Sequence, residues 1–265
     1  MARPVEGTIL TVVREAAAAA RARLQQEDSL AAVVAAAQDT ARVHADAAQR
    51  AEAQTFVDLM IPVVKGWSTE TGIQLTSMGV QIHGGMGFIE ETGAAQHFRD
   101  SRIAAIYEGT TAIQANDLIG RKTARDSGAA AKAVLAQMRA TAVELAKAGG
   151  DLAALQRQLS AGVDALEAAV DYVVANFGKD IRAVSVGSVP YLMLFGVVAG
   201  GWQMARAALV AKRNLAQSDA DKAFYTTKVI TARFYGDHVL TQAPGLADTV
   251  VNGAAAALDI DDSNF

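Results

Sequence analysis

The chain has 265 residues, and 28 acidic against 24 basic side chains leave a formal net charge of −4. An apolar share of 51% excludes a disordered or collagen-like chain, and this length buries a core without a disulfide or metal staple. The sequence contains no cysteine, which excludes disulfides and thiolate sites and fits a reducing, cytoplasmic compartment. The acidic balance, with no long basic run, predicts no nucleic-acid partner.

Apolar residues recur at helical spacing along the chain, and the alternation typical of strands is nearly absent. For the first part we predict a helix over 8–23, one or two helices over 29–64, a helix over 70–83 capped by Ser68 or Thr69, a polar loop over 84–102 and a helix over 111–125. For the second part we predict helices over 129–148, 151–177, 189–214 and 220–240, and weak helicity over 248–258. The predicted fold is all-α, in two consecutive helical bundles with domains 1–125 and 126–265.

One uncharged stretch, Ala183–Ala205, is long enough to be a candidate membrane span. Gly187, Ser188 and Pro190 interrupt its first third, so only Val189–Val198 is strongly apolar. A helix that is apolar on every face also suits the centre of a soluble bundle, which is the prediction here, with no membrane partner. The large aromatic side chains are predicted to anchor the core: Trp67, Phe177, Tyr191, Phe195, Trp202, Phe224 and Phe234.

Two segments depart from the plain helical pattern, and the first is Gln81-Ile82-His83-Gly84-Gly85-Met86-Gly87-Phe88. It follows a predicted helix rather than a strand and lacks the third glycine of a dinucleotide-binding fingerprint. Taken alone, the double glycine indicates a helix end and a turn. Adjacent glycines also let a backbone approach a ligand or another chain closely, so this alternative stays open.

The second segment is Ile106-Tyr107-Glu108-Gly109-Thr110-Thr111-Ala112-Ile113-Gln114. Its Thr111-x-x-Gln114 spacing matches a capping box, which predicts that a helix starts just after Glu108. An acid at this place commonly interacts with the helix dipole, but it can also be a positioned general base beside free amides. The residues alone leave both interpretations open. The four histidines show no metal-ligand spacing, so no metal site is predicted.

Both segments, with Arg99-Asp100-Ser101-Arg102-Ile103 between them, resemble the C-terminal helical domain of the acyl-CoA dehydrogenases. That family carries a QIxGGxGF-type turn and an IYEGT-type stretch in this order and at this spacing. The resemblance covers residues 1–125 and is sharpest over 74–121. The later half resembles the additional C-terminal helical region of the longer bacterial members, notably at 189–194 and 231–238.

The resemblance implies a role for each matching residue. Glu108 corresponds to the catalytic base, which takes the α-proton of an acyl-CoA thioester while the β-hydrogen leaves as hydride to N5 of FAD; the bound acyl chain desolvates this carboxylate. Gly109 corresponds to a substrate contact. The flavin contacts implied at the helix start are Thr110, Thr111 and Ala112. Those implied for the flavin of a neighbouring subunit are Gln81, Ile82, His83, Gly84 and Gly85, which predicts a homo-oligomer, either a dimer or a dimer of dimers.

Complete members of that family also have an N-terminal helical domain and a central β-rich domain, and neither is found in this sequence. We therefore expect a part of a longer enzyme that alone neither holds FAD tightly nor turns over acyl-CoA. Electron-transfer flavoprotein is the acceptor implied by the resemblance. Two alternatives remain: a helical interaction or scaffold domain without catalysis, and an acyl-CoA oxidase with the same base.

Overall fold

The computed structural model describes residues 30–217 and 221–264, and these residues form an all-α fold, as predicted, with no strand among them. The predicted helix over 8–23 lies outside the described residues. The helices are α2 (Leu30–Val43), α3 (Ala47–Ile82), α4 (Gly85–Phe88), α5 (Ala94–Ala104), α6 (Thr111–Asp117), α7 (Ala129–Ala148), α8 (Ala153–Asn176), α9 (Ile181–Val186), α10 (Ser188–Leu215), α11 (Lys222–His238), α12 (Ala243–Asn252) and α13 (Ala254–Leu258). Shorter 3-10 turns lie at Glu90–Thr92, Gly150–Leu152, Leu240–Gln242 and Asp262–Asn264, and a π-helical turn lies at Leu118–Ala124.

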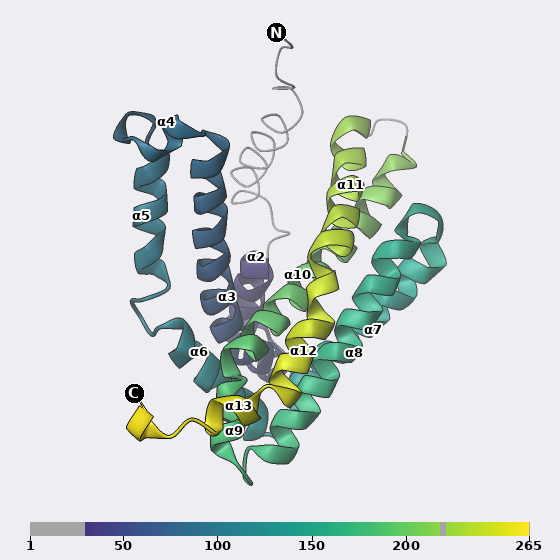
Figure 1. Ribbon diagram of the computed structural model, residues 1–265. Coiled ribbons are helices and arrows are strands. Elements are labelled where there is room, and N and C mark those ends of the chain that lie inside the picture. The colour runs from purple at the N-terminus through teal and green to yellow at the C-terminus, as the bar shows by residue number, and fades with distance from the viewer. Residues whose placement is uncertain (1–29, 218–220, 265) are drawn as a thin grey trace.

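Helix α10 runs through the middle of the molecule and packs against α3, α6, α7, α8, α11 and α12 (Figure 1). Its side chains Tyr191, Phe195 and Trp202 are buried. By length and composition α10 is apolar enough to cross a membrane, and 72% of its most apolar window is buried inside the protein. The apolar surface of α10 is therefore used by the protein's own core.

The two predicted bundles share one hydrophobic core, which includes Val63 of α3 and Phe195 of α10. Trp67 of α3 lies directly on the backbone of α10, because a Cβ added at Gly196 would stand 2.1 Å from its ring carbon Cγ. The predicted boundary at residue 125 stays a prediction.

Two of the aromatic anchors are predicted wrongly. Phe224 and Phe234 are 40% and 60% exposed, whereas the others are buried or pack against the core. Helix α11 buries the face that carries Val229, Ala232 and Gly236, and the two phenylalanines lie off that face at helical spacing.

The prediction of a separate helix over 70–83 is wrong, because α3 continues without a break for 36 residues. Pro62 lies inside α3 and is buried among Val57, Leu59, Met60 and Val63, and this packing outweighs the proline's preference against a helix interior. Thr69 does not cap a helix start; its hydroxyl donates to the carbonyl of Lys65 at 2.8 Å, as threonines inside helices do.

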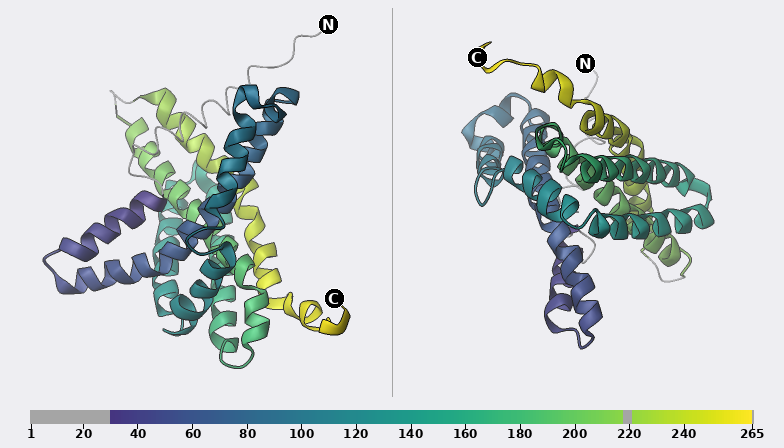
Figure 2. Two further views of the ribbon diagram at one scale, coloured as in Figure 1. Left: turned by 90° about the vertical axis from the view of Figure 1, so that its left-hand side faces the viewer. Right: turned by 90° about the horizontal axis from the view of Figure 1, so that it is seen from below.

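The break that does occur separates α2 from α3. Asp46 is the N-cap of α3 and accepts a hydrogen bond from the backbone N–H of Ala48 at 2.8 Å. The guanidinium of Arg50 donates to the carbonyl of His44 at 2.6 Å and so ties the turn to the new helix. Helix α2 and the first turns of α3 project from the body of the molecule as a hairpin (Figure 2).

The prediction of a polar loop over 84–102 is also wrong, because this stretch contains α4, a 3-10 turn and most of α5. Gly93, with φ 73°, starts α5, whose Ala94 and Ala95 are buried. Arg99 donates two hydrogen bonds to the carboxylate of Glu90 at 2.8 and 2.9 Å. Helices α3 and α5 form an arm with α4 at its tip (Figure 1), so the glycines end one helix and start others instead of making a loop.

In the second half, the helix predicted over 129–148 is α7 itself, and α8, α10 and α11 each begin and end within two residues of the prediction. Gly253 divides the weakly helical segment predicted over 248–258, which forms the end of α12 and then α13. The helix predicted over 111–125 is also present, but after Asp117 its hydrogen bonding widens to the π-helical turn.

The π-helical turn is joined to α10 by a buried pair of hydroxyl groups. Thr123 Oγ1 and Tyr191 Oη are 3.1 Å apart, and burial raises the pKa of Tyr191. We expect Thr123→Val to lower the free energy of unfolding by about 1–2 kcal/mol, because the Tyr191 hydroxyl loses its buried partner. Tyr191→Phe costs less, because the Thr123 hydroxyl can turn to a carbonyl of its own helix. Urea unfolding measures both, with Thr227→Val on the exposed side of α11 as the control; equal midpoints for Thr123→Val and the control would contradict the expectation.

Candidate active site

The connection between α5 and α6 carries Glu108 and has an unusual backbone. Glu108 has φ 54° and Gly109 has φ 90°, so two consecutive residues adopt left-handed conformations. For a non-glycine residue such a φ costs about 1–3 kcal/mol, and it persists only when neighbouring contacts enforce it. We call residues 108–111 the catalytic turn, after the role that the sequence resemblance implies for Glu108.

The start of α6 is capped one residue earlier than predicted. Thr110, not Thr111, is the N-cap, and its hydroxyl accepts a hydrogen bond from the backbone N–H of Ile113 at 3.4 Å. Gln114, the second member of the predicted capping box, donates from Nε2 to the carbonyl of Glu108 at 3.3 Å. The two left-handed residues shift the register of the cap, and this shift frees the Thr111 side chain for another contact.

That other contact comes from α3, which holds the catalytic turn at two points. Lys65 Nζ donates to the carbonyl oxygen of Gly109 at 2.6 Å. Thr111 Oγ1 donates to Glu70 Oε1 at 2.5 Å. Both contacts are partly buried and join residues 44 and 41 positions apart in sequence. Sequence reasoning missed Lys65 and Glu70, because nothing in a long helix marks which polar residues will face a distant turn.

The Glu108 side chain is exposed, so the apolar surroundings that would make it basic do not come from the described part of this chain. Within residues 30–217 and 221–264, the backbone N–H groups of Glu108 and Ala112 make no hydrogen bond. Gly109 and Thr111 are half-buried beside them. The structure thus brings together all five predicted residues from 108 to 112, with a carboxylate and unengaged N–H groups at the surface.

The double-glycine bend lies at the far end of the α3–α5 arm (Figure 1). Gln81 is eleven residues beyond Glu70 on α3, or about 16 Å along the helix axis. Gln81, His83, Gly84 and Gly85 are exposed, and Ile82 is half-buried. The structure therefore does not bring the bend and the catalytic turn into one pocket.

The glycines of the bend differ in what they require. Gly84 has φ 60°, a conformation that favours glycine. A Cβ at Gly87 would meet the carbonyl oxygen of Val80 at 2.2 Å, so α4 lies against α3 only because this residue is glycine. Gly85 has open space around it. Gly87 was not among the predicted site residues, and its role is to fix the shape of the bend.

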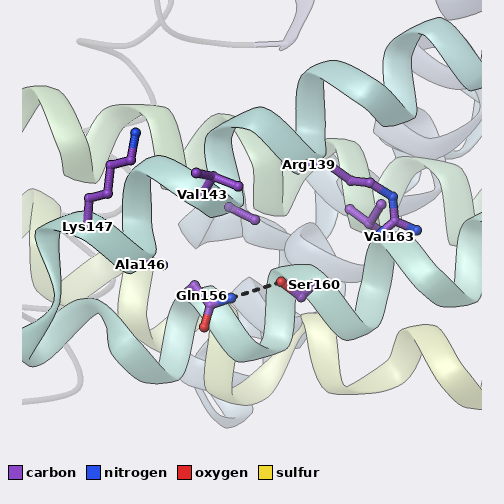
Figure 3. A pocket seen from close by; sticks show the side chains of 8 residues that line it. Arg139, Val143, Ala146, Lys147, Gln156, Ser160 and Val163 are labelled. Carbon is purple, nitrogen blue, oxygen red and sulfur yellow. Dashed lines mark hydrogen bonds between the residues drawn. The ribbon is translucent and has the colours of Figure 1, made fainter.

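The hollow between α7 and α8, of about 520 Å³, is lined by none of the predicted site residues (Figure 3). On its wall, Gln156 Nε2 donates to Ser160 Oγ at 3.0 Å. The Arg139 guanidinium lies at its edge and pairs with Asp164 and Glu167 at 2.8 and 2.6 Å. Arg139, Gln156 and Ser160 are engaged in these contacts, and no residue of the catalytic turn lines the hollow, so it is not a candidate for the chemistry implied by the turn. No group of three or more potential metal ligands occurs in the part of the chain that the structure describes.

Comparison with known proteins adds independent evidence. The family "Acyl-CoA dehydrogenase, C-terminal domain" matches residues 7–124, and the family "Acetyl-CoA dehydrogenase C-terminal like" matches residues 134–261. The chain is 46% identical over 199 residues to 3-methylmercaptopropionyl-CoA dehydrogenase of Ruegeria pomeroyi, covering 75% of this chain and 34% of that protein. It is 32% identical over 216 residues to a broad-specificity linear acyl-CoA dehydrogenase of Mycobacterium tuberculosis, covering 78% of this chain and 35% of that protein.

A butyryl-CoA dehydrogenase of Syntrophomonas wolfei is 29% identical over 239 residues, covering 86% of this chain and 38% of that protein. The chain thus spans about a third of the length of the curated relatives it matches. The two family matches between them cover the catalytic turn, the bend and the later helices. The chain therefore belongs to the acyl-CoA dehydrogenase family, and it corresponds to the C-terminal helical part of these enzymes.

Proposed function

We propose that this chain supplies the catalytic base and part of the flavin-facing surface of an FAD-dependent acyl-CoA dehydrogenase. The observation that carries the proposal is the catalytic turn, where α3 holds Glu108 in a left-handed conformation with its carboxylate exposed. A helix cap needs neither the strain at Glu108 nor the contacts from α3. Strain of this kind concentrates at functional sites.

The polar groups of the turn fit a flavin and a thioester. Carbonyl and ribityl oxygens need N–H or O–H donors, and the unengaged N–H groups of Glu108 and Ala112 are such donors. Thr110, Thr111 and Ala112 would hold FAD, and Gly109 would lie against the substrate. When bound, FAD accepts the β-hydrogen of the substrate as hydride at N5.

In the proposed reaction, the Glu108 carboxylate removes the α-proton of the acyl-CoA thioester. The Glu108 N–H donates to the thioester carbonyl and so stabilises the negative charge that develops on its oxygen. The bound acyl chain excludes water from the carboxylate, which makes it more basic. Exposure of Glu108 in the described chain fits this order of events, because the apolar cover arrives with the substrate and the remainder of the enzyme.

The bend at 81–85 is proposed to contact the flavin of a second subunit. Its surroundings support an interface, because Phe88 is 82% exposed, and Met78 and Met86 are 58% and 54% exposed. Exposed apolar side chains that lie together mark contact surfaces. The electron acceptor is proposed to be an electron-transfer flavoprotein, as the family resemblance implies.

The test uses an assembled enzyme, in which this chain replaces the matching segment of the Ruegeria relative. We expect it to contain about one FAD per chain. It should oxidise acyl-CoA with an artificial electron acceptor, assayed first with 3-methylmercaptopropionyl-CoA and butyryl-CoA, the substrates named for two relatives. The chain alone is expected to lose flavin on dialysis. A folded assembled enzyme without flavin or turnover would refute the proposal in favour of a non-catalytic scaffold, and peroxide formation would indicate an oxidase.

A further inference from the structure

We propose that Lys65 and Glu70 of α3 are positioning residues that hold the catalytic turn in its active geometry. The proposal rests on the function proposed above, in which Glu108 is the base. Neither side chain is expected to touch the substrate; both act through the backbone and the Thr111 hydroxyl.

Lys65 fixes the direction of one peptide group. The peptide bond between Gly109 and Thr110 is planar and trans, so its C=O and N–H point in opposite directions. Lys65 on α3 holds the Gly109 carbonyl at 2.6 Å. The Thr110 N–H is therefore turned away from the Lys65 ammonium group. Without the ammonium group, this peptide is free to rotate and to relax the left-handed backbone.

Glu70 fixes the direction in which the Thr111 hydroxyl group donates its hydrogen bond. A distance of 2.5 Å between Thr111 Oγ1 and Glu70 Oε1 is typical of a strong, charge-assisted hydrogen bond to a carboxylate. Because the single hydroxyl proton is used in this bond, Thr111 offers only acceptor lone pairs to a ligand. Glu70 thereby decides both the place of Thr111 and the kind of group that Thr111 can bind.

The left-handed conformation of Glu108 persists only where surrounding contacts enforce it, whereas Gly109 adopts its positive φ at little cost. Gln114 holds the Glu108 carbonyl, Lys65 the Gly109 carbonyl, and Glu70 the Thr111 hydroxyl. Gln114 belongs to the same short helix as the turn and moves with it. Lys65 and Glu70 belong to α3, which is anchored in the core at Met60 and Val63, so these two contacts set the turn relative to the body of the protein.

The first measurement is hydrogen–deuterium exchange of the full chain without ligand. Lys65→Met and Glu70→Leu should speed exchange in peptides spanning 106–114 and leave α7 and α8 unchanged, because only the turn loses contacts. Lys65→Arg keeps a donor and Glu70→Gln keeps an acceptor, so exchange in these peptides should stay close to that of the wild type. Lys147→Met, at the exposed end of α7, is the matched control. Unchanged exchange at the turn in both deletion variants would overturn the proposal.

The second measurement is steady-state kinetics of the assembled enzyme. Lys65→Met and Glu70→Leu should lower kcat by roughly 10- to 100-fold with little change in KM, because a base displaced by about 1 Å is still beside a bound substrate. Lys65→Arg and Glu70→Gln should recover most of kcat.

Full activity of both deletion variants, alongside an inactive Glu108→Gln, would overturn the positioning role and leave the base intact. An active Glu108→Gln would instead refute the proposed function, and the exchange measurement would still decide the positioning role. Should Lys65→Met fail to fold by circular dichroism, Lys65→Gln, which removes the charge and shortens the side chain, takes its place in both measurements.

Discussion

Glu108→Gln should lower kcat/KM of the assembled enzyme by roughly 10³-fold, because general bases contribute about 10²- to 10⁴-fold. Glutamine matches glutamate in size and keeps an acceptor oxygen, but it does not take up a proton near neutral pH. The backbone contacts from Lys65 and Gln114 go to carbonyl groups and do not depend on the Glu108 side chain. The variant should therefore keep its FAD and its fold, both measured by flavin absorbance and thermal unfolding beside the rate.

Two further variants separate loss of the base from loss of an acid at the surface. Glu144→Gln on the exposed side of α7 removes one negative charge far from the turn and should leave the rate unchanged. Glu108→Asp keeps the carboxylate but withdraws it by one carbon, so an intermediate rate is expected. If kcat/KM of the Glu108→Gln enzyme were within a few-fold of the wild-type value, the base would be another residue.

Gly196→Ala should lower the free energy of unfolding by roughly 3 kcal/mol, at the upper end of the range for overpacked cores. The added methyl group would stand 2.1 Å from Trp67 Cγ and 2.6 Å from Trp67 Cβ. These atoms lie next to the backbone of α3, so a rotamer change does not relieve the clash and the two helices must separate. The loss exceeds the gain of up to about 1 kcal/mol that alanine brings to a helix interior.

The matched control is Gly72→Ala, which is also inside a helix but has nothing within 4 Å of the added Cβ. It should stabilise the chain by about 0.5–1 kcal/mol through helix propensity alone. Urea unfolding followed by tryptophan fluorescence measures both variants. An equal increase in the free energy of unfolding in the two variants would mean that α3 and α10 are not in contact at Gly196.

Much of the helical architecture could be predicted because its signals are local. Helix α7 follows Gly128 and ends at Gly149, whose φ values of 79° and 59° are those that glycine favours, and its apolar residues repeat at helical spacing. The errors arose where a residue type that is common at helix ends also occurs inside a helix. Pro62 and Thr69 suggest a helix boundary in sequence, but the core around Met60 and Val63 carries the helix through both.

The site could be predicted only as a set of motifs. The IYEGT stretch locates Glu108 and its neighbours, and the structure places these residues together. The left-handed φ of Glu108 and the cap at Thr110 are local, but the motif does not state either of them. The contacts from Lys65 and Glu70 join residues more than 40 positions apart. Side-chain pairing over such a separation is a property of the packed fold, which residue spacing does not encode.

Because α3 is unbroken, the number of residues in it determines the distance and the rotation between the double-glycine bend and the contacts to the catalytic turn. A single residue inserted between 71 and 80 would rotate the double-glycine bend by about 100° and move it by about 1.5 Å relative to Lys65 and Glu70. A point substitution in this stretch changes the surface of one helical turn only. A change in the length of the stretch would change the position and orientation of the whole bend. Homologous chains that keep both motifs should therefore preserve the number of residues separating Lys65 from Gly84, even where the identities of those residues drift.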